Sequence, residues 1–337
     1  MAVTNLTGIR DPKTYEELFC SPEITQEVQK QLISLIVVNI LQSIIAFLGN
    51  TLILVALHKE SVLHSPSKIL FRCLATTDLC VGLISEPLIV VYWMSLVNER
   101  FDICRYAQVL IFVTGHLLCS VSLLTLTAIG VDRLIALLLG LRYRQVVTIK
   151  RTYSTVCAFW AVSFAGATMF FWKYEASLLY AAIGTIACLV ILIVSYTKIF
   201  LTLRHHQSSV QNRFFHDKKN STAPLNIARY KKAVYNALWL QLALVVCYLP
   251  YGIVVVVMTK TGLSSSLYIA RQVALTLIML NSSLNPVLYC LKIREVRQAV
   301  KITIRQLCCL GQNLSSSLSS SLNPYPQAGK RAGANPN

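Results

Sequence analysis

The sequence predicts an all-α membrane protein: a seven-transmembrane helix bundle with a C-terminal amphipathic helix. Of the 337 residues, 55% are hydrophobic and only 13% are charged, which is more apolar than one water-facing core requires. The apolar residues gather in seven runs, each long enough for a helix to cross a bilayer. The basic residues recur between these runs rather than in one stripe. Despite the net charge of +17, this pattern predicts a membrane topology and no nucleic-acid partner.

Each apolar run is predicted to be helical, because irregular backbone and open strand edges cannot face lipid. The runs cover approximately residues 32–57, 69–94, 106–138, 155–171, 178–201, 234–258 and 267–291. The chain then divides into four parts. These are an extracellular N-terminal segment (1–31), a seven-helix domain (32–291), an amphipathic helix with two cysteines (292–309) and a disordered cytosolic tail (310–337).

The distribution of positive charge predicts which side of the membrane each end faces. The first, third and fifth connections and the C-terminal tail together carry 23 Lys and Arg residues, and the opposite side carries 8. Cytosolic loops are the richer ones in such residues, so we expect a multi-pass plasma-membrane protein with its N-terminus outside. Residues 1–31 lack a secretory signal, and the first helix is expected to direct its own insertion. The sequon at Asn5 would then be open to glycosylation, although a chance match is an equal alternative.

Asp78, midway along the second apolar run, is the polar residue that most needs an explanation, because a charge inside hydrocarbon is costly. Its candidate partners at compatible depth are Asn50, Ser122, Asn281 and Asn285. Oxygen ligands suit a hard cation, and one carboxylate balances one charge, so this set predicts a site for Na⁺ or for a shared proton. A hydrogen-bond network that only holds the helices together is the alternative.

Short motifs occur in order, at least one on each apolar run. They are Gly49-Asn50, residues 74–78 (LATTD), Asp132-Arg133-Leu134, Trp160, Tyr196, residues 247–250 (CYLP) and residues 285–289 (NPVLY). Together they resemble the signature set of rhodopsin-like (class A) G protein-coupled receptors. Each motif alone is a modest signal, but the ordered set spans the whole bundle.

The resemblance implies a receptor, not an enzyme, that binds an extracellular ligand and activates a heterotrimeric G protein when helix six moves outward. At rest Arg133 is expected to pair with Asp132, and after the movement to face the G protein. The resemblance also implies that Leu141 inserts into an apolar pocket of the G protein and that two prolines kink their helices. The residues implied in coupling and activation are Asp132, Arg133, Leu141, Tyr196, Tyr248, Pro250, Asn285, Pro286 and Tyr289.

The segment after the seventh run alternates basic and apolar residues at helical spacing, which predicts an amphipathic helix on the inner leaflet. Cys308 and Cys309 beyond it form a candidate palmitoylation site. The serine clusters at 315–317 and 319–321 are candidate kinase targets that would recruit an arrestin-like partner. A plain disordered tail is the alternative for these serines.

The chain departs from the family in its extracellular disulfide. Most members tie the third helix to the second extracellular loop, but this loop (172–176) contains no cysteine. Cys20 and Cys104 are the two cysteines left on the outer side, which is oxidising. We therefore predict a Cys20–Cys104 bridge that holds the N-terminal segment over the pocket, with two free thiols as the alternative.

The short second loop is similar to those of melanocortin, cannabinoid and lysolipid receptors, which favours a lipid-like or peptide ligand. Gly115 stands where amine receptors carry an acid, and residues 267–291 contain no lysine for retinal. The predicted outer pocket consists of Glu86, His116, Cys119, Tyr251 and Tyr268, with Tyr92 and Gln272 beside them. Glu86 either receives a cationic ligand group or faces another helix, and His116 is either a ligand contact or a packed histidine.

Other classes of membrane protein fit less well. An intramembrane hydrolase needs histidines and acids at metal-ligand spacing, and a transporter needs inverted repeats, and the sequence shows neither. A receptor-like protein that does not signal remains an alternative, since coupling is inferred by analogy. Tyr230 stands where many members carry a glutamate that restrains Arg133, which predicts basal activity. We expect no cofactor other than Na⁺ as an allosteric ion.

Overall fold

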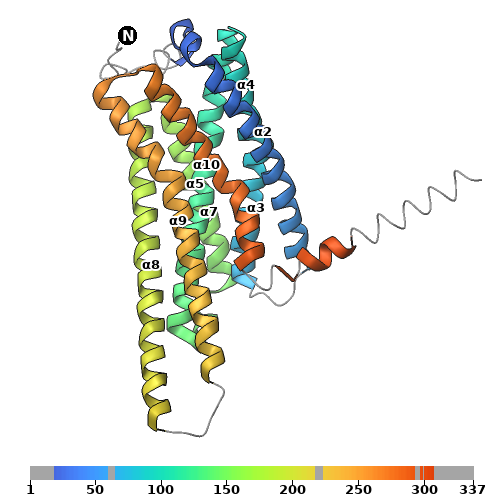
Figure 1. The fold of residues 1–337 in the computed structure, drawn as a ribbon, viewed down its shortest axis with the longest axis vertical. Helices are drawn as coiled ribbons and strands as arrows, with labels where there is room; N and C mark the ends of the chain where they lie inside the picture. Colours follow the sequence, from blue (N-terminus) through green and yellow to red (C-terminus); the bar gives the residue numbers. More distant parts are fainter. Residues whose placement is uncertain (1–18, 60–64, 217–222, 293–296, 299, 307–337) are drawn as a thin grey trace, which may run out of the picture.

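The computed structural model describes residues 19–59, 65–216, 223–292, 297–298 and 300–306. Within these ranges seven helices are long and apolar enough to cross a membrane, as the sequence predicts. They stand side by side as one bundle (Figure 1). The predicted fold class is therefore confirmed.

The second crossing is interrupted, whereas the others are continuous helices. It consists of α3 (Ser65–Cys80), the π-helical turn η2 (Val81–Ser85) and α4 (Glu86–Val97). The remaining crossings are α2 (Pro22–Lys59), α5 (Phe101–Leu139), α7 (Ile149–Thr168), α8 (Tyr174–His216), α9 (Ala223–Thr261) and α10 (Ser265–Lys292). Three short elements lie in the connections: η3 (Gly140–Arg142), α6 (Tyr143–Val146) and η4 (Met169–Phe171).

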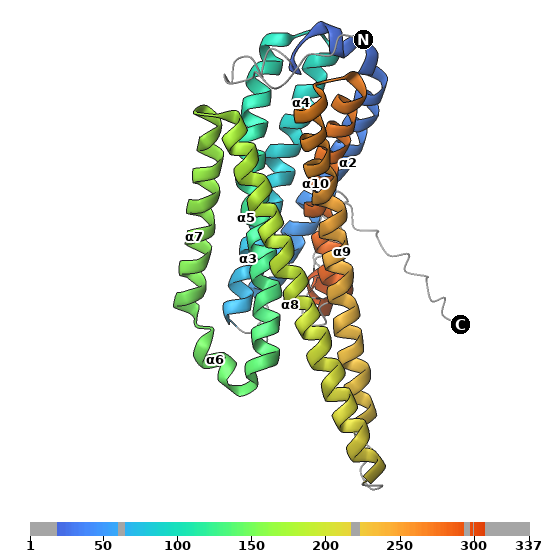
Figure 2. The same ribbon diagram turned by 90° about the vertical axis from the view of Figure 1, so that its left-hand side faces the viewer.

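Most of the helices continue beyond the apolar runs that predicted them. The first begins at Pro22, well before the run that starts at residue 32. The helices α8 and α9 lie side by side and project far past the others at one end, as two views of the bundle agree (Figures 1 and 2). Hydropathy marks only the part of a helix that lies in lipid, whereas backbone hydrogen bonding continues into water. The sequence therefore predicts the crossings better than the helix ends.

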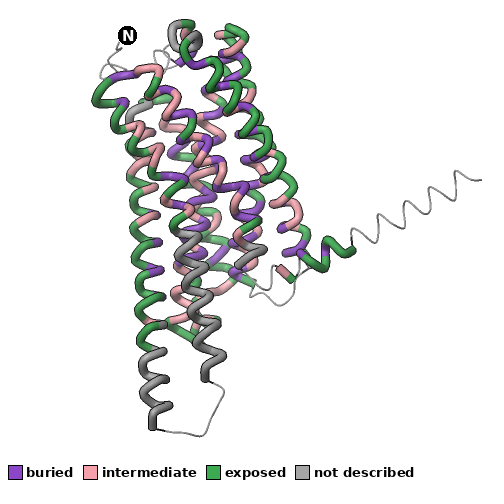
Figure 3. The backbone as a smooth tube through the Cα atoms, in the orientation of Figure 1, coloured by how far each residue is buried: buried purple, intermediate pink, exposed green. Residues whose placement is uncertain are grey.

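The third crossing, α5, lies at the centre of the bundle and packs against α3, α4, α7 and α8. Buried residues gather where the helices face one another, and exposed residues cover the outward faces (Figure 3). Many of those outward residues are large and apolar, among them Leu41, Leu48, Phe164, Ile183 and Val256. In water such a surface would be unfavourable, but it suits contact with lipid tails.

Two glycines allow α2 to approach its neighbours closely. A Cβ atom at Gly49 would lie 2.9 Å from both Cβ and Cγ of Pro286 on α10. A Cβ atom at Gly82 in η2 would lie 2.9 Å from Cβ of Ala46 on α2. The Ser43 hydroxyl donates a hydrogen bond to the Gly82 carbonyl oxygen at 2.7 Å, which fixes the level at which α2 meets η2.

The C-terminal part of the chain is described only in part. Residues 300–306 are helical, and in Figure 1 they leave the bundle at a wide angle beside the end of α2. Val300 and Thr303, three residues apart on one helical face, are buried, while residues 301–302 and 304–306 are exposed. Cys308, Cys309, the serine clusters and the sequon at Asn5 lie outside the described residues.

Candidate functional site

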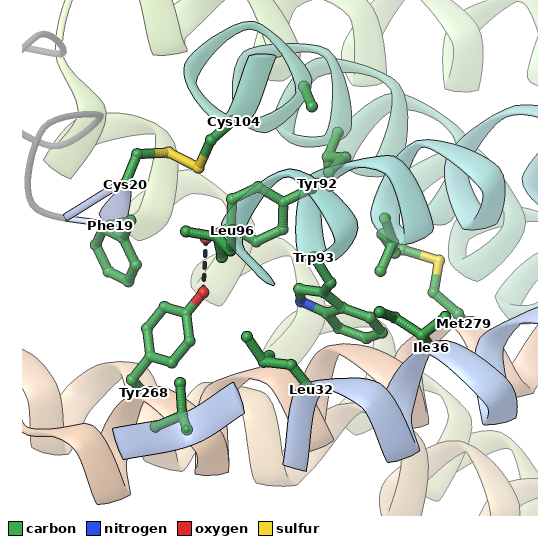
Figure 4. Close-up of a cluster of buried hydrophobic side chains, with 14 of the residues drawn as sticks. Phe19, Cys20, Leu32, Ile36, Tyr92, Trp93, Leu96, Cys104, Tyr268 and Met279 are labelled. Atoms are coloured by element: carbon green, nitrogen blue, oxygen red, sulfur yellow. Dashed lines mark hydrogen bonds between the residues drawn. A yellow bond between two sulfur atoms is a disulfide. The ribbon is translucent and has the colours of Figure 1, made fainter. Parts of the chain in front are cut away.

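One end of the bundle is closed by the residues that precede α2. The structure contains the predicted disulfide between Cys20 and Cys104, with a Cα–Cα distance of 6.0 Å and a separation of 84 residues along the chain. We call Phe19 and Cys20 the N-terminal hook, and the end of the bundle that it covers the disulfide end. Phe19 is only 1% exposed, and its ring centroid lies 5.9 Å from that of Tyr268 on α10 (Figure 4). The hook is thus part of the packed interior.

Arg271 on α10 lies between the hook and the predicted pocket. Its guanidinium carbon is 4.9 Å from the ring centroid of Phe19 and 5.9 Å from that of Tyr251 on α9. Both rings are within the range of cation–π attraction. Arg271 therefore joins the hook to α9, the helix that the resemblance expects to move.

Beneath the hook, aromatic residues of α4 are hydrogen-bonded to α10. The hydroxyls of Tyr92 and Tyr268 are 2.9 Å apart (Figure 4), and the Trp93 Nε1 donates to Gln272 Oε1 at 3.3 Å. Tyr268, predicted as a pocket residue, is thereby held by α4. These four residues form the aromatic layer, which separates the hook from the deeper interior.

Glu86 lies two helical turns below Trp93 on α4 and is completely buried. Neither of its carboxylate oxygens has a hydrogen-bond partner among the described residues. A buried polar group without a partner is costly, and such groups in a native structure call for an explanation. Glu86 is the most unusual residue of the predicted pocket.

The structure does not bring all of the predicted pocket residues together. His116 on α5 faces α7 and α8. Its ring centroid lies 6.4 Å from that of Tyr180 on α8 and 5.8 Å from that of Phe112 on α5 itself. A Cβ atom at Gly166 of α7 would lie 3.0 Å from His116 Nε2. These contacts show a packed ring, but His116 Nε2 is buried and has no hydrogen-bond partner among the described residues, so the expected hydrogen-bonded histidine is matched only in its packing. Cys119 on the same helix is half-buried, and among the described residues it forms no hydrogen bond to the aromatic layer.

Asp78 lies at the centre of a polar network between the second, third and seventh crossings. Its Oδ1 accepts hydrogen bonds from the Ser122 hydroxyl at 3.0 Å and from the Ser282 hydroxyl at 2.9 Å. Its Oδ2 accepts one from Asn285 Nδ2 at 2.7 Å. Asn281 makes no hydrogen bond to Asp78 among the described residues, and its Nδ2 has no partner. Ser282 thus has the contact that the sequence led us to expect of Asn281.

Asn50 supports this network from α2. Its Nδ2 donates to the carbonyl oxygen of Ala46 at 2.8 Å and to that of Ser282 at 3.1 Å, so it positions Ser282 without touching Asp78. The side-chain oxygens of Asn50 and Asn285 are buried and have no partner in the described part of the chain. With Asp78 they supply carboxylate and amide oxygens, the donor set that Na⁺ takes.

The opposite end of the bundle, which we call the Arg133 end, departs from the expected pairing. Asp132 accepts hydrogen bonds from the Ser67 hydroxyl at 2.9 Å and from the Tyr143 hydroxyl at 2.6 Å. Within the described ranges it forms no ion pair with Arg133, so the expectation of a resting Asp132–Arg133 pair is wrong for this structure. Successive side chains on a helix point about 100° apart. Asp132 therefore faces α3 and α6, while Arg133 is exposed. The guanidinium carbon of Arg133 lies 5.8 Å from the ring centroid of Phe71.

The other residues implied in coupling lie near this end or along α9 and α10. Leu141 in η3 is 98% exposed, just after Gly140 ends α5 with φ of 51°. Tyr196 on α8 is buried, and its hydroxyl oxygen would lie 3.5 Å from a Cβ atom at Gly130 on α5. Pro250 and Pro286 lie inside their helices, and Tyr248 is buried. The side chain of Tyr289 lies outside the described residues.

A family model described as "7 transmembrane receptor (rhodopsin family)" matches residues 49–177 and 167–289, which is most of the chain. The chain belongs to this receptor family. It follows that this receptor is a multi-pass membrane protein, in accordance with its seven membrane-length helices. Members of the family are receptors rather than enzymes, and they act with an extracellular ligand and a G protein.

Several residues of this receptor that form its candidate sites were not predicted. Ser67 and Tyr143 hold Asp132, and nothing in the sequence near them indicates it. Ser282 could have been suspected, because it lies three residues before Asn285 and so on the same face of α10. The contact between Phe19 and Arg271 could not be predicted, because it forms only when the disulfide holds the start of the chain near α10.

Proposed function

We propose that this receptor binds an extracellular ligand at the disulfide end and activates a heterotrimeric G protein at the Arg133 end. The observation that carries the proposal is the state of Arg133, whose exposed guanidinium is not paired with Asp132. A guanidinium is always charged and presents several donors in a fixed plane, so it is suited to bind backbone carbonyls or the carboxy-terminus of a partner helix.

The orientation of the receptor is part of this proposal. A structural disulfide forms in an oxidising compartment, which favours placing Cys20 and Cys104 outside the cell. The excess of Lys and Arg in the segments at the opposite end favours the cytosol for Arg133. Two unrelated arguments therefore support the same topology.

The exposed Leu141 supports a partner at the Arg133 end. A leucine that is 98% exposed, in a short 3-10 turn directly after α5, gains stability when it is buried against another protein. Tyr143 directly follows this turn and is held by Asp132, so the turn is fixed to α5. We propose that Leu141 and Arg133 contact the G protein together.

We propose that α9 is the moving helix. Pro250 removes a backbone hydrogen bond in the middle of α9 and allows a bend there. Tyr251 directly follows Pro250 on the side of the disulfide end and contacts Arg271, which also contacts the hook. A ligand that displaces these contacts would change the position of α9. The ligand's identity, and recruitment of kinases and arrestin by the serine clusters, are further parts of the proposal.

The test is a G protein activation assay in cells that report on several G protein classes, with a library of lipid-like, peptide and small-molecule ligands. A signal from the wild type that Arg133→Ala abolishes supports the proposal. Arg144→Ala is the matched control, because Arg144 is exposed at the same end and is expected to retain the signal. Silence in every class, with the receptor present at the cell surface, would favour the receptor-like protein that does not signal.

A further inference from the structure

The carboxyl group of Glu86 differs from that of Asp78, although both are buried in the second crossing. Asp78 accepts three hydrogen bonds from side chains of α5 and α10. Glu86 accepts none from any described residue, and it is equally inaccessible to solvent. A carboxyl group inside a membrane-spanning helix is costly unless it is paired or neutralised. The fold supplies partners for Asp78, whereas Glu86 has no hydrogen-bond partner among the described residues.

The turn η2 places Glu86 inside the bundle. In an uninterrupted α-helix, a residue eight positions after Asp78 would be rotated by about 80° from it. The π-helical turn between Val81 and Ser85 accommodates one extra residue, which returns Glu86 to the face of Asp78. Gly82 permits this turn to lie against α2. The burial of Glu86 therefore results from a specific local structure, and π-helical turns occur frequently at functional sites.

Two further acceptors lie at the level of Glu86. Ser43 on α2 meets Gly82, and these helices run in opposite directions. Glu86 lies four residues after Gly82, and Asn39 lies four residues before Ser43, both in the direction of the disulfide end. Glu86 and Asn39 are therefore at about the same level of the bundle. Asn39 Nδ2 donates to Thr276 Oγ1 on α10 at 3.1 Å, while its Oδ1 has no partner.

Gln42 completes the set. It lies three residues from Asn39 on the same face of α2, it is buried, and its Oε1 has no partner in the described part of the chain. The carboxylate of Glu86 and the amide oxygens of Asn39 and Gln42 are all acceptors. We call these three residues the acceptor cluster.

We propose that the acceptor cluster is a binding site for a monovalent cationic group, separate from the Asp78 network. Glu86 supplies one negative charge and the two amides are neutral, so the charge that it balances is +1. The cationic group is either the protonated amine of a ligand or an alkali-metal ion. An ammonium group has three N–H donors, one for each acceptor residue, and an alkali-metal ion takes the same oxygens as ligands.

The surroundings of the cluster favour access from the disulfide end. Tyr92, Trp93 and Tyr268 lie between Glu86 and the hook, and aromatic faces attract cations. The third-helix position used by amine receptors is Gly115, and the methyl group of Met279 lies 3.6 Å from where its Cβ would be. At the level of Gly115 an amine therefore finds no acid on the third crossing, but it finds Glu86 on the second. Only this entry route rests on the proposed function.

The test measures cation binding to the purified full chain in lipid nanodiscs, without a G protein, by the shift of its thermal unfolding midpoint. One series titrates 2-phenylethylamine, with the neutral isostere 2-phenylethanol in parallel. A second series replaces choline chloride by NaCl at constant ionic strength. The variants are Glu86→Gln, which keeps the shape of the side chain, and Gln42→Ala, which keeps the charge.

We expect phenylethylamine or Na⁺, but not phenylethanol, to stabilise the wild type in a manner that depends on Glu86. Glu86→Gln should weaken the apparent affinity about tenfold to a hundredfold, the value of a hydrogen bond to a charged group. Gln42→Ala should weaken it about threefold or more. The matched control is Asp102→Asn, which removes an exposed acid at the same end and should change the affinity less than about twofold.

The two sources of the cation give different outcomes. A Glu86-dependent shift with phenylethylamine identifies a ligand amine. A Na⁺-dependent shift that Glu86→Gln abolishes and Asp78→Asn retains identifies an ion site distinct from Asp78. If neither cation gives a shift that depends on Glu86 and Gln42, Glu86 is a buried protonated carboxyl group and the proposal is overturned. Because no signalling is measured, this failure is distinct from the failure of the G protein assay.

Discussion

Asp78 and its neighbours illustrate what can be inferred at the scale of single residues. The importance of Asp78 and Asn285 could be predicted, because a charge inside an apolar run needs partners. The contribution of Ser282 could not. Asn281 and Ser282 are adjacent on one helix, and the residue that faces Asp78 depends on the rotation of α10 next to Pro286. That rotation is set by packing and not by composition.

The Asp78 network gives a prediction that separates these two neighbours. Ser282→Ala removes a hydrogen bond to a buried carboxylate and should lower the stability of the receptor by about 1–3 kcal/mol. It should also reduce any stabilisation by Na⁺. Asn281→Ala, the matched control, removes no hydrogen bond to Asp78 and should leave the Na⁺ effect intact. Thermal unfolding of purified receptor, with and without Na⁺, measures both. Equal effects of the two variants would contradict the network seen in the structure.

At the scale of elements, the interruption of the second crossing is the feature that the sequence did not predict. Residues 69–94 were expected to form one helix, and hydropathy does not distinguish an α-helical turn from a π-helical one. Gly82 and Pro87 are the only local indications, since both weaken a regular helix. The consequence is large, because the turn decides which face of α4 carries Glu86.

The contact between α2 and α10 leads to a second prediction. A methyl group at position 49 would lie 2.9 Å from Pro286, so Gly49→Ala should force the helices apart. Overpacking of this kind costs about 1–3 kcal/mol. Gly252→Ala on α9 is the matched control, because a Cβ there meets nothing within 4 Å and alanine favours a helix. The comparison needs only thermal unfolding midpoints in one detergent. A Gly49→Ala midpoint at or above that of Gly252→Ala would show that the close approach is not maintained.

The short element α6 leads to a third prediction. Tyr143→Phe removes the 2.6 Å hydrogen bond to Asp132. Because this bond holds the turn that contains Leu141, two residues earlier, the position of Leu141 would no longer be fixed. We expect weaker G protein activation, by about threefold to tenfold, with normal surface expression. Tyr153→Phe is the control, since the Tyr153 side chain is exposed on α7. Dose–response curves for the same ligand and G protein provide the measurement. An unchanged response in Tyr143→Phe would show that the hydrogen bond between α6 and Asp132 does not contribute to G protein coupling.

At the scale of the whole molecule, the number of crossings and their order could be predicted, because lipid imposes a minimum apolar length on every helix. The Cys20–Cys104 bridge could also be predicted, since these were the two cysteines on the outer side of the predicted topology. The burial of Phe19 could not, because it depends on contacts with residues of α10 far along the chain. Long-range packing of this kind leaves no local pattern.

The disulfide leads to a fourth prediction. Cys20→Ser, Cys104→Ser and the double variant should be destabilised to the same extent, by about 2–5 kcal/mol, because each removes the same cross-link. Cys157→Ser, at an exposed free cysteine of α7, should have little effect. Thermal unfolding compares the four variants with the wild type, and mass mapping of the wild type should find Cys20 and Cys104 protected from alkylation until a reductant is added. Alkylation of both without reduction would exclude the bridge.

The proposed topology leads to a fifth prediction. An epitope placed before residue 19 should be stained on intact cells, and one placed after residue 306 should be stained only after the membrane is made permeable. An odd number of crossings requires this difference. A cytosolic marker protein serves as the control for membrane integrity. Staining of both epitopes on intact cells would mean that the number of crossings is even.

The disulfide also constrains the order of events while the chain is being synthesised. Cys20 leaves the ribosome early, but its partner is 84 residues further along and follows the whole second crossing. The bond can therefore close only after two helices have been inserted and the start of the third has reached the same side. A nascent chain that stalls before residue 104 therefore retains an unpaired thiol at Cys20. Formation of the disulfide thus shows that the first two crossings have been inserted and that Cys20 and Cys104 lie on the same side of the membrane.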